Sequence, residues 1–500
     1  MALVAGIALV AARSAMLPGL AFWNTAELQA VGPLMGTGHP AGFPTYVLLG
    51  WFASVVFQPL GEPAFRMNLL AGVCLAVAAG VTVDLVRALT RSTLLGIAAG
   101  VGLALTPIAW SIGTHAETHA LHLAMVAVLL RLLVAWEDRT RDRLIVVAAA
   151  VFGLSVGNHS LTLLLAPPVI LFINAVAPGF WRNGRLGRLC VIALVATVVL
   201  VYLELPLRAG PFRAALVYGR PETWDGFWYI VLGEQFRGSL IDPIGDLPGK
   251  IGALVQRSLA EFGPLAILLP FALAATIRRR PRYALLTGSA VLITWFFAAS
   301  YENADIGRYY LGPVLMAWTW IGILAGLVAE TGRRLIDGLA GRQSPMHHDP
   351  PPPGPPRLIE ALLAIVIVAP TVFAIPARFD AVDRSRDDGA ARWVDHALNE
   401  MESGAVVVSW WSYSTPLWYA QHVEGRRPDL VIIDDRTRLD QGLGDITEVI
   451  DAHLGRAPVY VIRDDPDEIQ LLAERYELEP IDGLDARSLT RVIGFRITGS

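Results

Sequence analysis

Long apolar runs recur along this chain and constrain its fold more than any other feature. A helix needs about 20 apolar residues to cross a bilayer core, and runs of this length repeat from the N-terminus to about residue 376. Hydrophobic residues make up 54% of the chain and charged residues 17%, a composition untypical of soluble globular proteins. We therefore predict an α-helical multi-pass membrane protein with about 11 transmembrane helices. The predicted helices cover 1–20, 65–90, 92–111, 119–136, 143–157, 160–178, 188–206, 251–277, 283–300, 309–330 and 357–376.

Arginines occur in every second short loop. The loops around 114–119 and 158–160 contain no Lys or Arg. By the positive-inside rule the arginine loops lie in the cytoplasm, so the polar segments between them face outward, and a bacterial cell membrane is the favoured setting. The cytoplasmic arginines are Arg87, Arg91, Arg139, Arg141, Arg143, Arg182, Arg185, Arg188, Arg278, Arg279, Arg280, Arg282, Arg333 and Arg334.

The sequence turns soluble after about residue 376. We divide the chain into a membrane domain, 1–376, with a proline-rich cytoplasmic linker at about 341–357, and an extracytoplasmic domain, 377–500. Alternating strand and helix patterns predict a small α/β domain with a parallel sheet, and without a glycine-rich phosphate loop we assign it no nucleotide. The predicted elements are helices at 390–401 and 415–422 and strands at 404–409, 430–434 and 458–462.

We expect neither a cleaved signal peptide in the N-terminal apolar run nor a disulfide between the two cysteines. Residues 1–10 are short for a signal peptide and lack a basic start, so we predict that 1–20 is a first, shortened membrane helix. Cys74 and Cys190 lie in apolar runs and are expected to be buried small side chains.

The first outer segment, 22–50, interrupts the apolar background with polar and helix-breaking residues. Asn24 and Glu27 have the spacing of a capping box, with Asn24 as the N-cap. Glu27 at the membrane face is a functional candidate, because an ionisable group at that depth is energetically unfavourable without a role. His39, in a proline-rich turn, either bonds backbone groups or orients an imidazole toward a phosphate or hydroxyl.

Two later outer loops carry further candidates. Glu117 lies between His115 and His119, whose i, i+4 spacing resembles a zinc site, but no third ligand is evident. We therefore interpret Glu117 as a second candidate carboxylate, on the same membrane face as Glu27. Asp305 and Arg308 either pair with each other or leave Arg308 for a lipid phosphate.

Aromatic residues gather in the segment 222–237. Trp224 and Trp228 are typical of an interfacial helix anchored at headgroup level, and they would also suit a helix that borders a lipid-linked donor.

Several motifs, in order along the chain, resemble the DUF2723 family. They are FWNTAELQAVGPLMGTGHPAGFPTYVLLG (22–50), FRMNLL (65–70), HAETHALH (115–122), GNHS (157–160), TWDGFWY (223–229) and DIGRYY (305–310), and the resemblance covers roughly residues 15–320. The family consists of multi-pass proteins related to the animal membrane O-mannosyltransferase. The resemblance implies a GT-C fold, a catalytic carboxylate in the first outer loop, and a sugar donor linked to a polyprenyl phosphate.

The family's first loop reads D-x-G/A-E, followed by H-P-x-G-Y-P. Asn24 stands where the family has aspartate, and Phe43 replaces tyrosine. Asparagine cannot accept a proton as a general base. The resemblance then implies either that Glu27, with Glu117, takes the base role, or that this member is impaired. The matching residues are Glu27, His39, Pro40, Gly42 and Pro44.

The resemblance implies transfer of a sugar, mannose above all, from a polyprenyl-phosphate donor to an acceptor hydroxyl on the outer face. The expected catalytic residues are Glu27, Glu117 and Asn24, and the expected donor-binding residues are His39, Arg308, Asp305, Trp224 and Trp228. No residue cluster requires a metal, so a divalent ion stays an open cofactor. The acceptor is a protein, glycan or lipid, and a net charge of −4 argues against nucleic acid.

Two alternatives stay open. A transporter or flippase of lipid-linked sugars would show internal repeats and broken helices at the midplane, and no repeat is found. A catalytically impaired scaffold is the other alternative, for which Asn24 is the best support.

Overall fold

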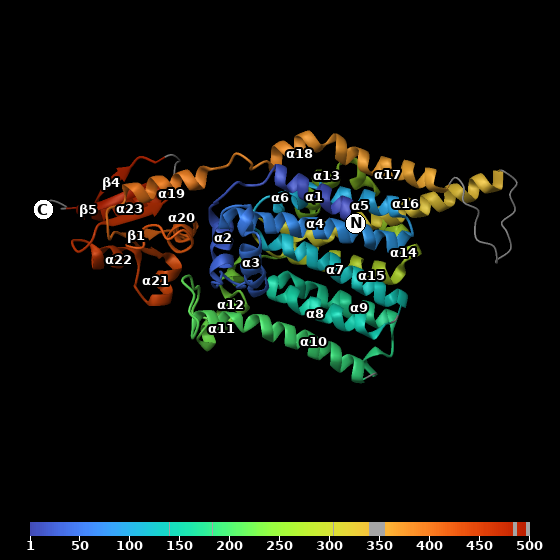
Figure 1. Ribbon diagram of the computed structural model, residues 1–500, viewed down its shortest axis with the longest axis horizontal. Coiled ribbons are helices and arrows are strands. Elements are labelled where there is room, and N and C mark those ends of the chain that lie inside the picture. The colour runs from blue at the N-terminus through green and yellow to red at the C-terminus, as the bar shows by residue number, and fades with distance from the viewer. Residues whose placement is uncertain (140, 183, 304, 340–355, 484–487, 497–500) are drawn as a thin grey trace.

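The computed structural model describes residues 1–139, 141–182, 184–303, 305–339, 356–483 and 488–496. A long helical bundle carries a sheet-bearing region at one end (Figure 1). The proline-rich linker predicted at about 341–357 falls outside the described residues except for its last two. The helices up to the sheet-bearing region are α1 (Ala2–Ser14), α2 (Trp23–Leu34), α3 (Pro44–Val56), α4 (Pro63–Thr90), α5 (Thr93–Ala104), α6 (Pro107–Ile112), α7 (Thr118–Arg139), α8 (Asp142–Asn158), α9 (Ala166–Val176), α10 (Gly184–Tyr202), α11 (Glu204–Ala209), α12 (Trp224–Val231), α13 (Leu247–Phe262), α14 (Leu269–Arg279), α15 (Pro281–Ala299), α16 (Leu311–Leu339), α17 (Pro356–Phe373) and α18 (Ile375–Val382).

All eleven predicted spans fall on helices, but not all of these helices are long enough to cross a membrane alone. Within the described residues, 6 helical segments have the length and hydropathy of a span, and the bent pair α17 and α18 would make 7. Four of the remaining predicted spans fall on α1, α5, α8 and α9, which have 13, 12, 17 and 11 residues. Prolines explain two of the breaks: Pro107 separates α5 from α6, and Pro167 follows a 3₁₀ turn at Ser160–Leu165.

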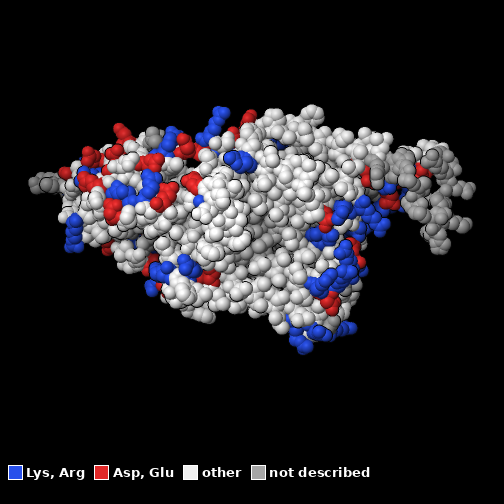
Figure 2. Space-filling model, viewed as in Figure 1, with Lys and Arg blue, Asp and Glu red and all other residues white. Residues whose placement is uncertain are grey.

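The arginine-bearing loops meet at one end of the bundle. Arg279 pairs with Glu330 at 2.7 Å, Arg282 with Glu137 at 3.5 Å, and the guanidinium of Arg280 donates to the carbonyl of Leu89 at 2.9 Å. Figure 2 shows a group of mainly basic residues at the end of the bundle away from the sheet-bearing region, and mixed basic and acidic residues over that region itself. The alternating arginine pattern therefore corresponds to a single end of the molecule, as the positive-inside argument requires.

The C-terminal region contains a mixed five-stranded sheet. Its strands are β1 (Val406–Ser409), β2 (Val431–Asp434), β3 (Val459–Arg463), β4 (Tyr476–Ile481) and β5 (Ser488–Phe495), in the order β2-β1-β3-β5-β4. The three predicted strands are β2, β1 and β3, and they pair in parallel. The last two strands pair antiparallel, so the prediction of a wholly parallel sheet is wrong. The sequence argument missed β4 because charged residues interrupt its apolar pattern.

Helices surround this sheet. They are α19 (Gly389–Glu400), α20 (Trp411–Trp418), α21 (Asp435–Gln441), α22 (Ile446–His453) and α23 (Pro466–Arg475), and a π-helical turn at Tyr419–Val423 extends α20. The predicted helices at 390–401 and 415–422 correspond to α19 and to α20 with this turn. The predicted domain boundary at 376/377 falls inside α18, whose Phe379 and Val382 pack with Trp110 of the bundle.

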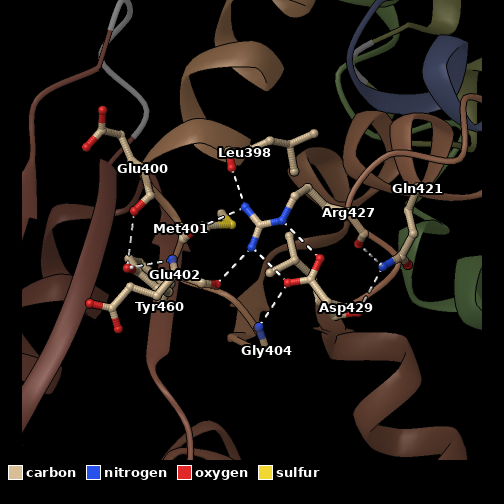
Figure 3. A network of polar contacts seen from close by, with 10 residues as sticks. Leu398, Glu400, Met401, Glu402, Gly404, Gln421, Arg427, Asp429 and Tyr460 are labelled. Atoms are coloured by element: carbon tan, nitrogen blue, oxygen red, sulfur yellow. Dashed lines mark hydrogen bonds and ion pairs between the residues drawn. The ribbon is translucent and has the colours of Figure 1, made fainter.

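Arg427 connects several segments within the C-terminal region (Figure 3). Its guanidinium donates to the carbonyls of Leu398, Met401 and Glu402, and it pairs with Asp429 at 2.9 Å. Asp429 in turn accepts from the backbone N–H of Gly404 at 2.9 Å. These contacts tie the end of α19 to the segments that lead into β1 and β2.

The C-terminal region packs directly on the first outer segment. The ring of Phe22 lies 5.5 Å from that of Trp393, and the hydroxyl of Thr415 donates to the carbonyl of Trp23 at 3.1 Å. The backbone N–H of Ala64 donates to the hydroxyl of Tyr419 at 2.9 Å. The polar start of α2 is therefore enclosed between the bundle and α20.

Candidate active site

Polar residues from separate outer loops line one cavity of about 520 Å³, which we call the histidine cavity. Segments far apart in the sequence meet here: the first outer segment, the loop before α7, the end of α8, and the turn Ile306–Tyr310 before α16. The side chains that carry its chemistry are Asn24, His39, Glu117, His119, His159, Arg237, Tyr301, Asp305, Arg308, Tyr309 and Trp411.

Glu117 is a buried carboxylate held by two partners. Arg308 donates to one of its oxygens at 2.7 Å, and the Nδ1 of His119 lies 2.9 Å from the other. Arg308 also pairs with Asp305 at 3.1 Å, as the i, i+3 spacing predicted. Burial opposes ionisation of Glu117, but Arg308 and His119 outweigh it and hold its pKa well below the ordinary value. Glu117 is thus a persistent carboxylate that fixes Arg308 and His119 rather than a strong base.

Glu27 is almost completely buried, with 1% of its surface exposed, and it holds His39 at two points. One carboxylate oxygen accepts from the backbone N–H of His39 at 2.9 Å, and the other pairs with the ring Nδ1 of His39. The rings of Phe43 and Trp411 pack against the imidazole at 5.0 and 5.5 Å. With Nδ1 occupied by Glu27, the Nε2 of His39 is the nitrogen left for a ligand.

Gly42 lets the H-P-x-G turn pack tightly beside this pair. Its φ of +78° lies in the left-handed region, and a Cβ there would approach a methyl carbon of Ile230 in α12 to 2.8 Å. Any larger residue would push α12 away from the turn that positions His39.

Buried amides fix the loops to one another. Asn68 of the FRMNLL motif accepts from the backbone N–H of Ala116 at 2.8 Å and donates to the carbonyl of Leu17 at 3.0 Å. Gln29 of α2 also donates to the Asn68 oxygen, at 2.9 Å. Asn68 therefore sets the position of the Glu117 loop relative to the first outer segment.

Asn158 of the GNHS motif fixes the position of the next loop, because its side-chain amide donates to the carbonyl of Thr118 at 3.0 Å. This contact brings the neighbouring His159 to the histidine cavity, where its ring centroid lies 4.5 Å from that of His119.

A second cavity of about 520 Å³ lies between the bundle and the sheet-bearing region, and we call it the interdomain cavity. Glu27 lines it, whereas His39 lines the histidine cavity, so the bonded Glu27–His39 pair lies between the two, and Tyr218 lines both. The charged groups that line the interdomain cavity are Glu27, Arg213, Arg220, Glu222, Asp434, Arg436 and Asp440, with His422 beside them.

Most of the predicted site residues line one of the two cavities. Two of the predictions about their arrangement are wrong. Asn24 lines the histidine cavity but is the second residue of α2, whose N-cap is Phe22 without a side-chain cap, so the predicted capping box is wrong. Glu27 and Glu117 line different cavities, so they do not share one pocket directly; His39 connects them, because it binds Glu27 and lines the cavity of Glu117.

The predicted tryptophans line neither cavity. Trp224 is 75% exposed and its ring packs edge-on to that of Trp228 at 5.5 Å. Val231, at the end of the same short helix α12, lines the histidine cavity, so both the anchoring alternative and a helix that borders the donor stay open.

The zinc-like spacing of His115 and His119 does not form a helical pair, because α7 begins at Thr118 and His115 lies in the preceding loop. Within the part of the chain that the structure describes, no group of three or more His, Cys, Asp or Glu residues is arranged to hold a metal ion.

Sequence reasoning missed several lining residues. His159 and Tyr309 stand in the quoted GNHS and DIGRYY motifs, so the motifs themselves were a signal for them. Trp411 and Asp434 belong to the C-terminal region, and only its docking against the bundle brings them to the cavities.

Comparison with known proteins finds similarity in segments that carry the quoted motifs. The family model of the TMEM260 N-terminal domain, described as a protein O-mannosyl-transferase, matches residues 24–177. The resemblance expected from the motifs is confirmed. The mouse protein O-mannosyl-transferase TMEM260 is 26% identical over an alignment of 446 residues, and the match covers 82% of this chain and 59% of the relative. The chain thus spans less than two thirds of the length of that relative.

Solved structures show the fold. ArnT from Cupriavidus metallidurans bound to undecaprenyl phosphate superposes with a TM-score of 0.65 at 14% identity, and covers 98% of this chain and 97% of its own. The apo form of the same enzyme gives a TM-score of 0.60 at 15% identity. The chain is therefore a multi-pass membrane protein with an ArnT-like GT-C fold, as the resemblance implied.

Proposed function

We propose that this protein is a membrane glycosyltransferase that moves a sugar, with mannose the first candidate, from a polyprenyl-phosphate donor to an acceptor hydroxyl. Two comparisons support it: the mouse relative is named a protein O-mannosyl-transferase, and the ArnT structure binds undecaprenyl phosphate. The observation that carries it is the bonded Glu27–His39 pair, which stands between two cavities of equal size and different chemistry.

The histidine cavity suits the donor. Arg308 and Arg237 supply cations, and His39 and His119 add imidazoles, so a phosphate finds charge-assisted hydrogen bonds there. The stacked rings of Phe297, Tyr301 and Tyr309, with centroids 5.6 to 6.0 Å apart, form an apolar wall for the sugar face or the first isoprene unit. Glu117 keeps Arg308 and His119 in position.

Glu27 is the proposed base. In a single displacement, Glu27 takes the proton of the acceptor hydroxyl while the hydroxyl oxygen bonds to the anomeric carbon. The bond from that carbon to the phosphate oxygen breaks, and the polyprenyl phosphate leaves with the electron pair, stabilised by Arg308. The product has inverted anomeric configuration. Glu117, kept ionised by Arg308, is the weaker base, and Asn24 has no proton-accepting group.

We place this site at the outer leaflet of a bacterial cell membrane. The arginine-rich end of the bundle then lies in the cytoplasm, and both cavities and the C-terminal region lie outside. A lipid-linked donor reaches the histidine cavity from the membrane, whereas the acceptor arrives from the aqueous side.

The test uses membranes that contain the protein and radiolabelled polyprenyl-phosphate mannose, with GDP-mannose as the comparison donor. We expect label to pass from the lipid to an acceptor and not from the nucleotide sugar. Movement of labelled lipid between leaflets without any transfer would replace the proposal with a flippase, and label taken only from GDP-mannose would contradict the donor class.

A further inference from the structure

An apolar groove at the edge of the bundle lies apart from both cavities, and we call it the edge groove. Helices α7, α8, α9 and α10 form it, with the turn Phe180–Arg182 at one end, and its volume is about 180 Å³. α10 packs along α8 at this edge (Figure 1). The lining residues are apolar except for the thiol of Cys190 and the indole N–H of Trp181, and that N–H already donates to the side-chain oxygen of Asn174 at 2.7 Å.

The edge groove opens toward the hydrocarbon of the membrane. Its lining residues Ile170 of α9 and Val191 of α10 are 46% and 51% exposed, and their neighbours Leu171 and Ile192 are exposed as well. On the helices of a multi-pass membrane protein, exposed aliphatic side chains contact lipid tails. Water would find almost no hydrogen-bond partner in the groove, so its occupant is an apolar chain from the bilayer.

The depth of the groove matches one leaflet. α8 begins at Asp142 and contributes residues from Ile145 to Phe152, and α10 begins at Gly184 and contributes residues from Cys190 to Leu194. At 1.5 Å per residue, these residues lie about 5–15 Å from the arginine-bearing ends of the two helices. Half of the hydrocarbon core is about 15 Å thick, so the groove holds a chain of the leaflet at that end and not of the opposite leaflet.

Guanidinium groups flank the same end of the groove. Arg182 belongs to the turn that closes it, and Arg188 stands one helical turn before Val191. Both arginines are exposed, and neither pairs with an acidic side chain among the described residues. By contrast, Arg279 and Arg282 of another basic loop pair with acids at 2.7 and 3.5 Å.

The neighbouring loop keeps this end basic. Between α7 and α8 it adds Arg139, Arg141 and Arg143, and the acids beside them are Asp138 and Asp142. Each arginine near the membrane surface favours an anionic lipid by a factor of about 5, whereas a zwitterionic lipid gains little. Guanidinium groups also bind phosphate oxygens in a bidentate way. The charges therefore select an anionic headgroup for the chain in the groove.

We propose that the edge groove binds an anionic glycerophospholipid of the leaflet at the arginine-bearing end. One acyl chain fills the groove, and Arg182 and Arg188 bind the headgroup phosphate. The opposite ends of α7 and α8 carry or lead into His119 and His159 of the histidine cavity. A lipid that joins the four helices at one end thus stabilises the helices that position those imidazoles at the other.

The test measures lipid retention by native mass spectrometry on the full chain, purified in detergent and freed of lipid. The probes are dioleoyl phosphatidylglycerol and dioleoyl phosphatidylcholine, which share their acyl chains and differ in net charge. Arg188→Gln is compared with Arg278→Gln, which changes an exposed arginine of α14 that has no acidic partner among the described residues. Ala149→Phe, which fills the groove, is compared with Ala274→Phe at an exposed position of α14 outside it.

We expect the wild type to retain phosphatidylglycerol about 10-fold or more over phosphatidylcholine, because two arginines meet the headgroup. Arg188→Gln should lower this preference about 5-fold, and Arg278→Gln should keep it. Ala149→Phe should lose the retained lipid, while Ala274→Phe should bind it as the wild type does.

Equal retention of the two lipids by the wild type overturns the anionic class. Equal losses in Arg188→Gln and Arg278→Gln reduce the effect to a general attraction by basic residues and overturn the headgroup site. Unchanged retention in Ala149→Phe overturns the groove, and if that variant does not elute as a folded protein, the arginine comparison decides alone. Displacement of phosphatidylglycerol by an equimolar polyprenyl phosphate would assign the groove to an isoprenoid chain instead.

Discussion

The two cavities have the same volume but differ in their polar groups. The histidine cavity contains Arg308, Arg237 and a cluster of imidazoles, and its carboxylates Glu117 and Asp305 both pair with Arg308. The interdomain cavity has nearly balanced charges and one carboxylate, Asp434, with an unpaired oxygen. One cavity therefore offers imidazole and guanidinium donors to an anion, and the other offers acids and arginines in nearly equal number.

The comparison shows how one buried residue, Glu27, can be linked to both cavities. Glu27 binds His39 through both oxygens, yet it also lines the interdomain cavity. In the proposed reaction, Glu27 meets an acceptor hydroxyl from one side, while its bonded imidazole meets the phosphate from the other. The predictions below test whether the two cavities have these separate functions.

Glu27→Gln should have the largest effect. A general base contributes about 10²- to 10⁴-fold to a rate, so turnover should fall by that factor while binding of polyprenyl phosphate persists. The control is Glu402→Gln, which changes an exposed carboxylate outside both cavities that pairs with Arg491 at 3.1 Å, and it should retain most activity. Transfer rates at saturating donor measure both, and equal losses would remove Glu27 from the base role.

Asp434→Asn should stabilise the protein at neutral pH. Burial raises the pKa of Asp434 from 3.8 to about 6. The folded wild type therefore loses stability as the pH rises from about 4 to about 6, and the loss is complete above that range. At 1.36 kcal/mol for each pKa unit, the variant should gain about 3 kcal/mol at pH 7.5 and nothing at pH 4. Thermal unfolding in detergent at both pH values checks this, and an equal gain at pH 4 would contradict it.

Arg308→Gln should weaken binding of the sugar donor and leave binding of the acceptor unchanged. It removes a cation from the histidine cavity, so the KM for polyprenyl-phosphate sugar should rise about 10- to 100-fold, as for a lost hydrogen bond between charged groups. Arg213→Gln, an arginine of the interdomain cavity, is the reciprocal control and should leave the donor KM unaltered. Loss of acceptor binding in Arg308→Gln would break the division between the cavities.

Asn24→Asp should have the smallest effect. Asn24 lines the histidine cavity, but Glu27 already occupies the wall between the cavities. We expect turnover to change by less than the about 10²-fold that a general base provides. A larger gain, in the same transfer assay, would show that the natural protein is impaired and that the position at 24 carries the base.

The motifs predicted the site better than residue patterns alone predicted its geometry. Glu27, His39, Glu117, Asp305 and Arg308 are near the two cavities, as expected from their shared membrane face. The capping box at Asn24 failed because α2 starts two residues earlier, and local spacing cannot fix where a helix begins when tertiary contacts such as Thr415 to Trp23 act on its first turn.

Trp224 and Trp228 show a further limit. Aromatic residues are amphipathic and suit both a sugar and a membrane interface, so their sequence pattern could not separate the alternatives. In the structure they are exposed on α12 and line neither cavity. His159 could have been taken from the GNHS motif, but its proximity to His119 depends on Asn158 binding the start of α7.

The sequence by itself determined the helical membrane architecture and the end of the bundle where the arginines lie, and it marked the first outer segment as a source of candidate site residues, because apolar run length and charge alternation are local properties. Only the tertiary structure decided that two cavities exist, that the Glu27–His39 pair lies between them, and that the Oδ2 of Asp434 has no hydrogen-bond partner among the described residues. The cavities form between segments hundreds of residues apart, such as those of Thr415 and Trp23, and even Glu27 and His39 are 12 residues apart, so no local helix or strand pattern encodes these features.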